Sequence, residues 1–316
     1  RLERKPEYRI GWYAAAAIFT GIIVSTFFFR NQEQAPLDPG SKTEVLRSEL
    51  KIGTDKAILT LTDGTEIPLE KGSAQTLQHA TTNGQEIVYR PTFSKETVRP
   101  EYNYLTVPRG GQFSVALSDG TQVWLNSESQ LKYPVAFAKG ETREVELLYG
   151  EAYFEVSPST LHNGAKFKVA TGTQEVTVLG TQFNIKAYND EETIQTTLVE
   201  GKVQVNVGKE SKTLVPREQS IVHPGSNDIG VKEVDVYSAT SWKKGIFSFN
   251  DMPLEEIMRV LARWYDIEVV FHDPSLKNSS FTGVLRKNQH IDVILESIKT
   301  TTNMNYEINK NTVIFK

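Results

Sequence analysis

The sequence predicts a mainly β protein in three parts: a single N-terminal transmembrane helix, a long all-β region and a small C-terminal α+β domain. Three observations lead to this prediction. Residues 10–29 carry no charge, residues 44–236 are short apolar runs of strand length separated by turn signals, and the residues after 241 alternate strand patterns with two amphipathic helical patterns.

The first part is the segment Ile10–Phe29, which reads IGWYAAAAIFTGIIVSTFFF. Twenty uncharged residues match the length that a helix needs to cross the hydrocarbon core of a bilayer. Four basic residues precede this segment and only one basic residue, Arg30, follows it closely. Because basic residues concentrate on the cytoplasmic side, we expect residues 1–9 to be a cytoplasmic stub and the rest of the chain to lie on the other side of the membrane.

Two other interpretations of Ile10–Phe29 are weaker. A cleaved signal peptide would have a shorter apolar region and small residues before the cut, whereas Glu33 stands where a small residue is needed. A buried core helix would have one polar face, and this segment is apolar all round. The chain begins at Arg1, so we also expect a longer cytoplasmic segment to precede it.

A linker and the all-β region follow. Residues 30–43 include the run NQEQAPLDPGSK, whose two prolines and glycine are typical of a linker. Residues 44–240 contain Asp63-Gly64 and Asp119-Gly120, each between alternating segments, which is a strong hairpin signal. Two weak internal repeats suggest recurring hairpins, namely LTDGTEIPL with LSDGTQVWL and LLYGEAYFEV with LVEGKVQVNV. The pattern leaves open whether these strands form a sandwich, a jelly roll or an irregular stack.

Residues 241–316 form the predicted α+β domain. Strand patterns at 246–249, 267–271, 281–285, 304–308 and 312–315 surround two helical patterns. Pro253 suits the start of the first helix, whose apolar face comprises Leu254, Ile257, Met258, Leu261 and Tyr265. The second helix repeats this face 37 residues later at Ile291, Ile294, Leu295 and Ile298. The spacing therefore predicts a duplicated strand–helix–strand unit.

Composition restricts the classes of function. The chain has no cysteine, which excludes disulfides, thiolate metal sites and a cysteine nucleophile. With a net charge of −4 overall and +3 in the first thirty residues, residues 31–316 carry −7. No basic patch is left to neutralise phosphates, so we expect no nucleic acid partner.

Catalytic motifs are missing. The sequence has no phosphate-binding loop, no GxGxxG after a strand and no GxSxG elbow, and its five histidines are scattered without HxxxH spacing. Acidic residues such as Glu141 fit the solvent face of a strand. We therefore expect no cofactor, no metal site and no enzyme activity on a free substrate.

One dipeptide and two tryptophans are candidate site residues. In VTVLGTQFNIKAY, the Thr181 hydroxyl can attack the Gly180 carbonyl and convert the amide into an ester that water opens. The simpler interpretation of Gly180-Thr181 is a turn between two strands. Trp124 or Trp264 could form a sugar platform, although core packing is the simpler expectation for both. A membrane-anchored glycan-binding module is therefore the alternative function.

Four motifs occur in order within a core of residues 105–225, namely VPRGGQFSVALSDGTQVWLNSESQLKYPVAF, REVELLYGEAYFEV, FKVATGTQEVTVLGTQFNI and LVEGKVQV. Together they resemble the FecR-type anti-sigma regulators, the iron-dicitrate-sensor family. The block from GIFSFNDMPLEEIMRVLARWYDIEVVF to the end resembles the C-terminal domain of the Bacteroidetes branch of that family. This domain is similar to the secretin/TonB short domains.

The resemblance implies a single-pass inner-membrane protein with a periplasmic bulk. Such regulators hold an extracytoplasmic-function sigma factor through a cytoplasmic segment, which the resemblance places before the first residue of this chain. Their C-terminal part, here residues 241–316, contacts the N-terminal signalling domain of a TonB-dependent outer-membrane transporter. Some members cleave themselves at a Gly-Thr bond, to which Gly180-Thr181 corresponds. The implied role is an anti-sigma factor that relays a transporter signal across the inner membrane.

Overall fold

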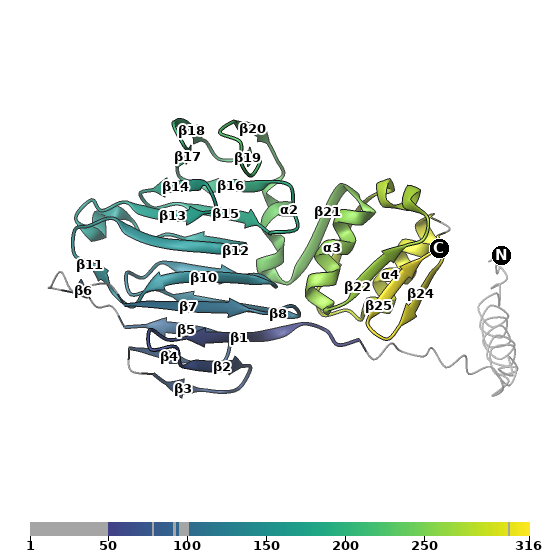
Figure 1. The fold of residues 1–316 in the computed structure, drawn as a ribbon, viewed down its shortest axis with the longest axis horizontal. Coiled ribbons are helices and arrows are strands. Elements are labelled where there is room, and N and C mark those ends of the chain that lie inside the picture. Colours follow the sequence, from purple (N-terminus) through teal and green to yellow (C-terminus); the bar gives the residue numbers. More distant parts are fainter. Residues whose placement is uncertain (1–49, 78, 91–92, 95–100, 303) are drawn as a thin grey trace, which may run out of the picture. The chain divides into compact units, whose positions relative to one another are not determined.

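The strand-rich part of the chain is built from hairpins that stack from β1–β4 at one end to β17–β20 at the other (Figure 1). The computed structural model describes residues 50–77, 79–90, 93–94, 101–302 and 304–316. The predicted cytoplasmic stub, transmembrane helix and linker (residues 1–43) lie outside these residues. Within the described residues, no helix has the length and apolar character needed to cross a bilayer.

The strands form two hydrogen-bonded faces. The first face runs in the order β2 (Glu66–Glu70), β1 (Thr54–Thr60), β7 (Tyr102–Val107), β10 (Ser129–Pro134), β12 (Arg143–Glu155), β13 (Phe167–Thr171), β14 (Gln174–Val178), β17 (Val203–Val207) and β18 (Glu210–Leu214). Most neighbours are antiparallel, as expected for hairpins, and β12 and β13 are parallel.

The second face runs in the order β3 (Gln75–Thr76), β4 (Ala80–Thr82), β5 (Glu86–Tyr89), β8 (Gly111–Ala116), β9 (Gln122–Leu125), the second half of β12, β15 (Gln182–Ala187), β16 (Ile194–Glu200), β19 (Glu218–Val222) and β20 (Ile229–Glu233). Two short strands, β6 (Phe93–Ser94) and β11 (Phe137–Ala138), pair separately. The predicted mainly β class is therefore confirmed for the described residues.

Alternating side chains from both faces fill one core. In β17, for example, Val203, Val205 and Val207 are buried while Gln204 and Asn206 point outward. The predicted hairpin turns are confirmed: Asp63-Gly64 joins β1 to β2, and Asp119-Gly120 joins β8 to β9. The aspartates accept hydrogen bonds from the backbone two residues on, which favours the turn.

Helix η1 (Ser159–His162) lies between β12 and β13, and the remaining elements follow residue 235. They are α2 (Val236–Thr240), η2 (Ser241–Lys244), β21 (Ile246–Pro253), α3 (Leu254–Tyr265), β22 (Glu268–Phe271), η3 (Pro274–Asn278), β23 (Ser280–Arg286), α4 (Ile291–Thr302), β24 (Tyr306–Asn309) and β25 (Thr312–Phe315). Strands β21 and β23 pair with each other, and β22, β25 and β24 form a second small sheet. The two strand–helix–strand units, β21-α3-β22 and β23-α4-β24, match the predicted duplication.

Both helices bury the faces that their periodicity predicted. Leu254, Ile257, Met258, Leu261 and Tyr265 of α3 join Ile291, Ile294, Leu295 and Ile298 of α4 in a second core. Pro253 immediately precedes α3, where its missing N–H costs no helical hydrogen bond. Residues Ser48–Lys316 nevertheless form one compact unit. A boundary at residue 241 between independently folding domains stays a prediction.

Candidate functional site at the Gly180–Thr181 corner and the C-terminal junction

Gly180-Thr181 lies at the corner where the chain crosses from β14 on the first face to β15 on the second. Gly180 has φ of 151°, a backbone conformation that residues other than glycine rarely adopt. A Cβ atom at this position would lie 2.9 Å from the Cα of Pro158. Conformation and close packing therefore both require glycine here.

Neighbouring corners enclose the Gly180–Thr181 peptide on two sides. On one side, the Val156 amide donates to the Thr181 carbonyl at 3.0 Å. On the other side, the buried Thr181 hydroxyl donates to the Lys202 carbonyl at 3.1 Å. A Cβ at Gly201 would lie 2.9 Å from Thr181 Oγ1 and 3.1 Å from the Gly180 carbonyl oxygen. Two hydrogen bonds and close backbone packing thus enclose the bond in a narrow space.

A histidine lies on the corner that packs against Gly180. Helix η1 (Ser159–His162) places His162 Nε2 2.8 Å from Ser157 Oγ, one residue before Pro158. Burial lowers the pKa of the His162 imidazole, Arg143 lowers it further, and Asp119 opposes the shift. The imidazole is therefore neutral near neutral pH and has the protonation state of a general base.

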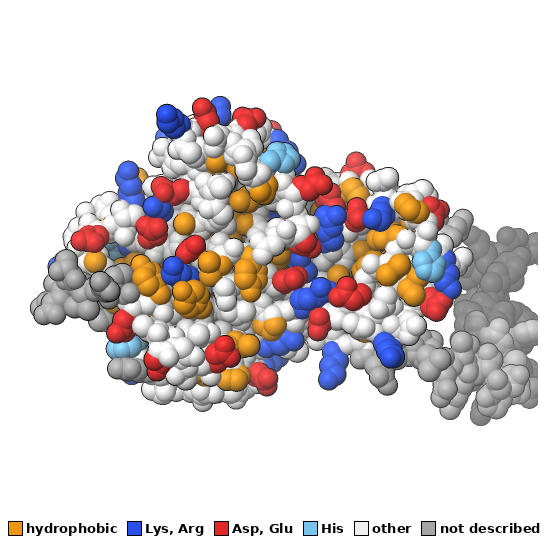
Figure 2. Space-filling model, viewed as in Figure 1, with side chains coloured by type: hydrophobic (Ala, Val, Ile, Leu, Met, Phe, Trp, Pro, Cys, Tyr) orange, Lys and Arg blue, Asp and Glu red, His pale blue; other side chains and the backbone are white. Residues whose placement is uncertain are grey.

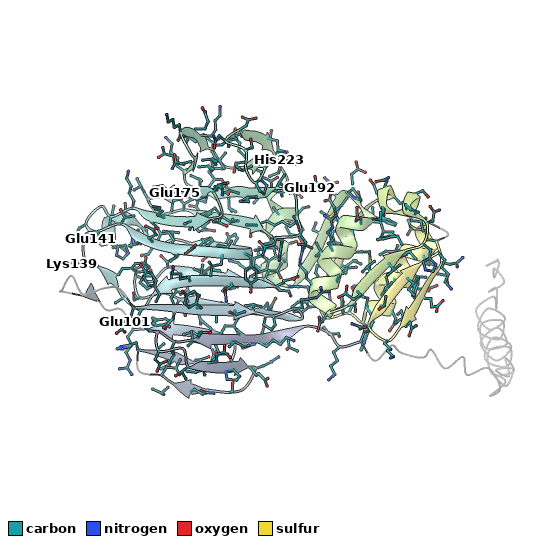
Figure 3. The ribbon with its side chains drawn as sticks, viewed as in Figure 1. Glu101, Lys139, Glu141, Glu175, Glu192 and His223 are labelled. Atoms are coloured by element: carbon teal, nitrogen blue, oxygen red, sulfur yellow. The ribbon has the colours of Figure 1, made fainter. Side chains whose placement is uncertain are left out.

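Glu141, His223 and other exposed titratable side chains are spread over the strand stack rather than gathered in one group. Figure 3 shows Glu141 and Lys139 at one end of the strand stack and Glu192 and His223 well apart from them. Among the described residues, no group of three histidine, aspartate or glutamate side chains is placed to hold a metal ion.

Trp124, the candidate sugar platform, is covered on its ring by a lysine. Lys243 Nζ lies 3.9 Å from the Trp124 ring centre and 4.2 Å from that of Tyr153. The same ammonium contacts Glu155 Oε1 at 2.5 Å. A sugar stacking on this face would have to displace an ammonium that both rings and a carboxylate stabilise.

The second candidate region is the junction of β21–β25 with the strand stack. Figure 2 shows basic and acidic side chains alternating over this junction. Arg263 of α3 is almost fully buried there, with Nη2 2.5 Å from Asp190 Oδ1 and Nη1 2.9 Å from Glu191 Oε1. Its guanidinium also stacks 3.6 Å from the Tyr188 ring centre. One side chain thus joins α3 to the loop after β15.

Backbone atoms and Arg109 reinforce this junction. The Gly110 amide donates to the Arg263 carbonyl at 2.7 Å. Arg109 Nη2 donates to the carbonyls of Ala262 and Ile267. These bonds occupy carbonyls near the C-terminal end of α3, where cations are favoured.

Polar side chains are buried beneath the junction. Glu151 Oε2 accepts from Asn126 Nδ2 at 2.8 Å, and its Oε1 accepts from Asn184 Nδ2 at 2.9 Å. Trp242 Nε1 donates to Asn184 Oδ1 at 3.2 Å, which links η2 to this cluster. Burial raises the pKa of the Glu151 carboxyl, and Lys186 and the two asparagines oppose the shift.

Trp264 belongs to the second core and also packs against the segment that leads into β1. A Cβ at Gly53 would lie 2.6 Å from the Trp264 ring, so the indole lies directly against the Gly53 backbone. Its Nε1 donates to the Lys287 carbonyl at 2.9 Å. Sequence reasoning placed Trp264 in packing correctly but missed Arg263, Glu151 and Lys287. Arg263 lies in a helix, Glu151 in a strand and Lys287 in a loop, and a single charged residue in any of these patterns gives no signal that it is buried.

Comparison with known proteins matches two segments of the chain to family models. Residues 103–204 match the family described as "FecR protein", and residues 246–315 match "FecR, C-terminal". No match is found among curated proteins.

Two crystal structures of a candidate anti-sigma factor from Parabacteroides distasonis, at 1.65 and 2.50 Å resolution, resemble the chain. Each is 31% identical with a TM-score of 0.60. They cover 67% and 68% of this chain, and 98% of each matched chain is covered.

Proposed function

This chain belongs to the FecR family of anti-sigma factors, and on that premise we propose that it relays a signal from a TonB-dependent outer-membrane transporter to an extracytoplasmic-function sigma factor. The observation that carries the proposal is the presence of both family segments in one chain, in order and packed as one compact unit. The proposed location is the inner membrane, with Ile10–Phe29 as the anchor and the following residues in the periplasm. The charge of −7 on residues 31–316 supports a protein partner over nucleic acid.

The edge of strand β22 is the surface that we assign to the transporter. In the sheet order β22-β25-β24, β22 pairs with β25 alone among the described strands. The amides of Glu268 and His272 donate towards β25. The backbone N–H and C=O groups of successive residues point to opposite sides of a strand, so those of Val269 and Phe271 face away from β25. They are available for an added strand from a partner.

The groove beside β22 suits a strand of mixed charge. Its volume is about 780 Å³, and both Val269 and Phe271 line it. Residues of the strand stack line the opposite side, including Arg109 and Glu128. A strand bound here would therefore touch both family segments at once, so that binding could influence their junction.

The experiment is a pull-down of outer-membrane proteins by the full chain in detergent, read by mass spectrometry. We expect enrichment of one TonB-dependent transporter with an N-terminal signalling domain. Recovery of polysaccharide instead would favour the glycan-binding alternative, and recovery of nothing specific would contradict the relay.

The substitution Val269→Pro tests the proposed edge. Proline removes the amide that an added strand needs while leaving the pairing with β25 intact. We expect at least tenfold weaker binding of the recovered signalling domain, equivalent to about 1.4 kcal/mol. Val269→Thr keeps the amide and the β-branched shape and should bind normally. Equal binding by both variants, with unchanged thermal unfolding, would move the contact to another surface.

Self-cleavage at Gly180-Thr181 is a second candidate function, supported by the enclosed glycine-rich corner. In this reaction Thr181 Oγ1 bonds to the Gly180 carbonyl carbon, the C–N bond breaks, and the released nitrogen becomes the Thr181 amine. Water then opens the ester to give a carboxylate at Gly180 and a free hydroxyl at Thr181. Turning of the hydroxyl away from the Lys202 carbonyl must precede the attack.

The substitution Thr181→Ala tests this reaction. We expect one intact chain from Thr181→Ala and two fragments, 1–180 and 181–316, from the unmodified chain, measured by intact-mass spectrometry. Thr173→Ala is the matched control because Gly172-Thr173 is another Gly-Thr pair in an exposed hairpin turn. An unmodified chain that stays whole after prolonged incubation would refute the proposal.

A further inference from the structure

Lys287 is the most deeply buried lysine side chain at the junction, with an exposed fraction of 3%. It lies between β23 and α4, and its ammonium reaches across to the strand stack. Nζ lies 3.2 Å from Gln112 Oε1 of β8 and 3.3 Å from Asn126 Oδ1 after β9. The Trp264 ring centre lies 3.9 Å away. The lysine therefore bridges the two family segments through uncharged groups.

Among the described residues, no carboxylate lies within ion-pair distance of the Lys287 ammonium. Glu151 accepts a hydrogen bond from Asn126, whose Oδ1 contacts the ammonium, and Asp55 lies on β1. Both carboxylates affect Lys287 through longer-range electrostatic attraction. The other charged groups around the side chain are cations: Lys71, Lys244 and Arg286 share its open pocket, and Lys186 and Arg263 line the small cavity that holds Glu151. A buried ammonium without a direct counter-ion is costly, and the Trp264 ring offsets only part of that cost.

We propose that Lys287 is a protonation switch for the junction: the neutral amine favours docking of β21–β25 on the strand stack, and the charged ammonium favours their separation. This inference is independent of which partner binds β22. Docking buries the amine among amides and indoles, whereas separation returns the side chain to water, which solvates the ammonium. The junction would therefore respond to the acidity of the compartment around it.

The direction of the pH response follows from linkage. Burial lowers the pKa of Lys287 from 10.5 to about 7, against the opposing effects of Glu151 and Asp55. Between pH 7 and 10.5 the separated state binds more protons than the docked state. Docking therefore strengthens as pH rises through this window, weakens as pH falls towards 7, and changes little below 7.

Hydrogen exchange of the Gly110 amide measures this equilibrium directly, because that amide donates to the Arg263 carbonyl across the junction. For the full chain in detergent, we expect its protection factor to rise about 90-fold from pH 6 to pH 9, after correction for intrinsic exchange. The Glu268 amide, bonded to Asn311 within the C-terminal segment, is the internal reference.

Variants separate the switch from a structural role. Lys287→Met keeps an unbranched apolar side chain, one atom shorter, without the charge, and should leave Gly110 highly protected at every pH. Lys287→Arg stays charged and should give low protection at every pH. Lys244→Met, which removes an exposed cation from the same pocket, should keep the wild-type response. A flat wild-type profile, or a pH response that persists in Lys287→Met, would overturn the proposal. If Lys287→Met does not fold, the wild-type profile and Lys287→Arg still decide it.

Discussion

Glycines mark the points at which the chain crosses between the two faces of the strand stack. Gly150, Gly180 and Gly201 all have positive φ, of 99°, 151° and 93°. Each also faces a contact that a side chain would fill, with Ser129, Pro158 and Thr181 respectively. Gly150 and Gly201 align in the weak repeat of LLYGEAYFEV with LVEGKVQVNV, and the chain passes from the first face to the second at Gly150 and from the second to the first at Gly201.

The substitution Gly150→Ala should be strongly destabilising. The new Cβ would lie 2.2 Å from Ser129 Oγ and 2.4 Å from Ser129 Cα, so backbone must move. We expect the free energy of unfolding to fall by about 3 kcal/mol or more, from overpacking and positive φ together. Gly140→Ala is the control, since Gly140 has φ of 80° with open space around it and should lose only about 1 kcal/mol. If chemical denaturation gives equal losses of unfolding free energy for both variants, the positive φ alone, and not the packing, accounts for both losses.

At the scale of elements, α3 serves two partners. One side of the helix fills the core of the C-terminal segment, and Arg263 on another side joins the strand stack. Periodicity predicts the first role because it depends on residues three and four apart. It does not predict the second, because Asp190 and Glu191 are more than seventy residues away in the chain.

The substitution Arg263→Met should loosen the docking of α3 at every pH. The change removes the Arg263 ion pair with Asp190 and leaves the largely buried Glu191 carboxylate with one cation fewer. We expect the docked state to lose about 3 kcal/mol of stability. The measurement is loss of protection at the Gly110 amide, independent of the titration of Lys287. Arg259→Met is the matched control on the same helix. Arg259 is half-exposed, and within the described part of the chain its only ion pair is with Glu255. Comparable losses in both variants would argue against a specific clamp.

At the scale of the whole molecule, the proposed transporter site and the Lys287 switch adjoin the same junction. The groove beside β22 is lined by Arg109 and Arg263, and a second pocket is lined by Lys287 and Trp264. A partner in the groove and a proton on Lys287 would then act on the same docking equilibrium. By linkage, each would change the strength with which the other binds. Transporter binding by this route is therefore expected to depend on pH above 7.

The sequence alone predicts the mainly β class, the Asp-Gly hairpins, both helices with their buried faces and the duplicated C-terminal unit. These features depend on residues that are close in the chain, where alternation, helical spacing and turn chemistry are visible. It also singled out Gly180-Thr181, but not the corner packing against Pro158 and Gly201 that encloses the bond.

The division of the strands between two faces and the burial of particular charges become visible in the three-dimensional fold. Lys287 and Arg263 read as ordinary surface cations in the sequence. Their burial depends on Gln112, Asn126, Asp190 and Glu191, which the fold brings to them from distant strands and loops. The cost of burying a charge is set by its surroundings in space, and no local pattern of residues records those surroundings.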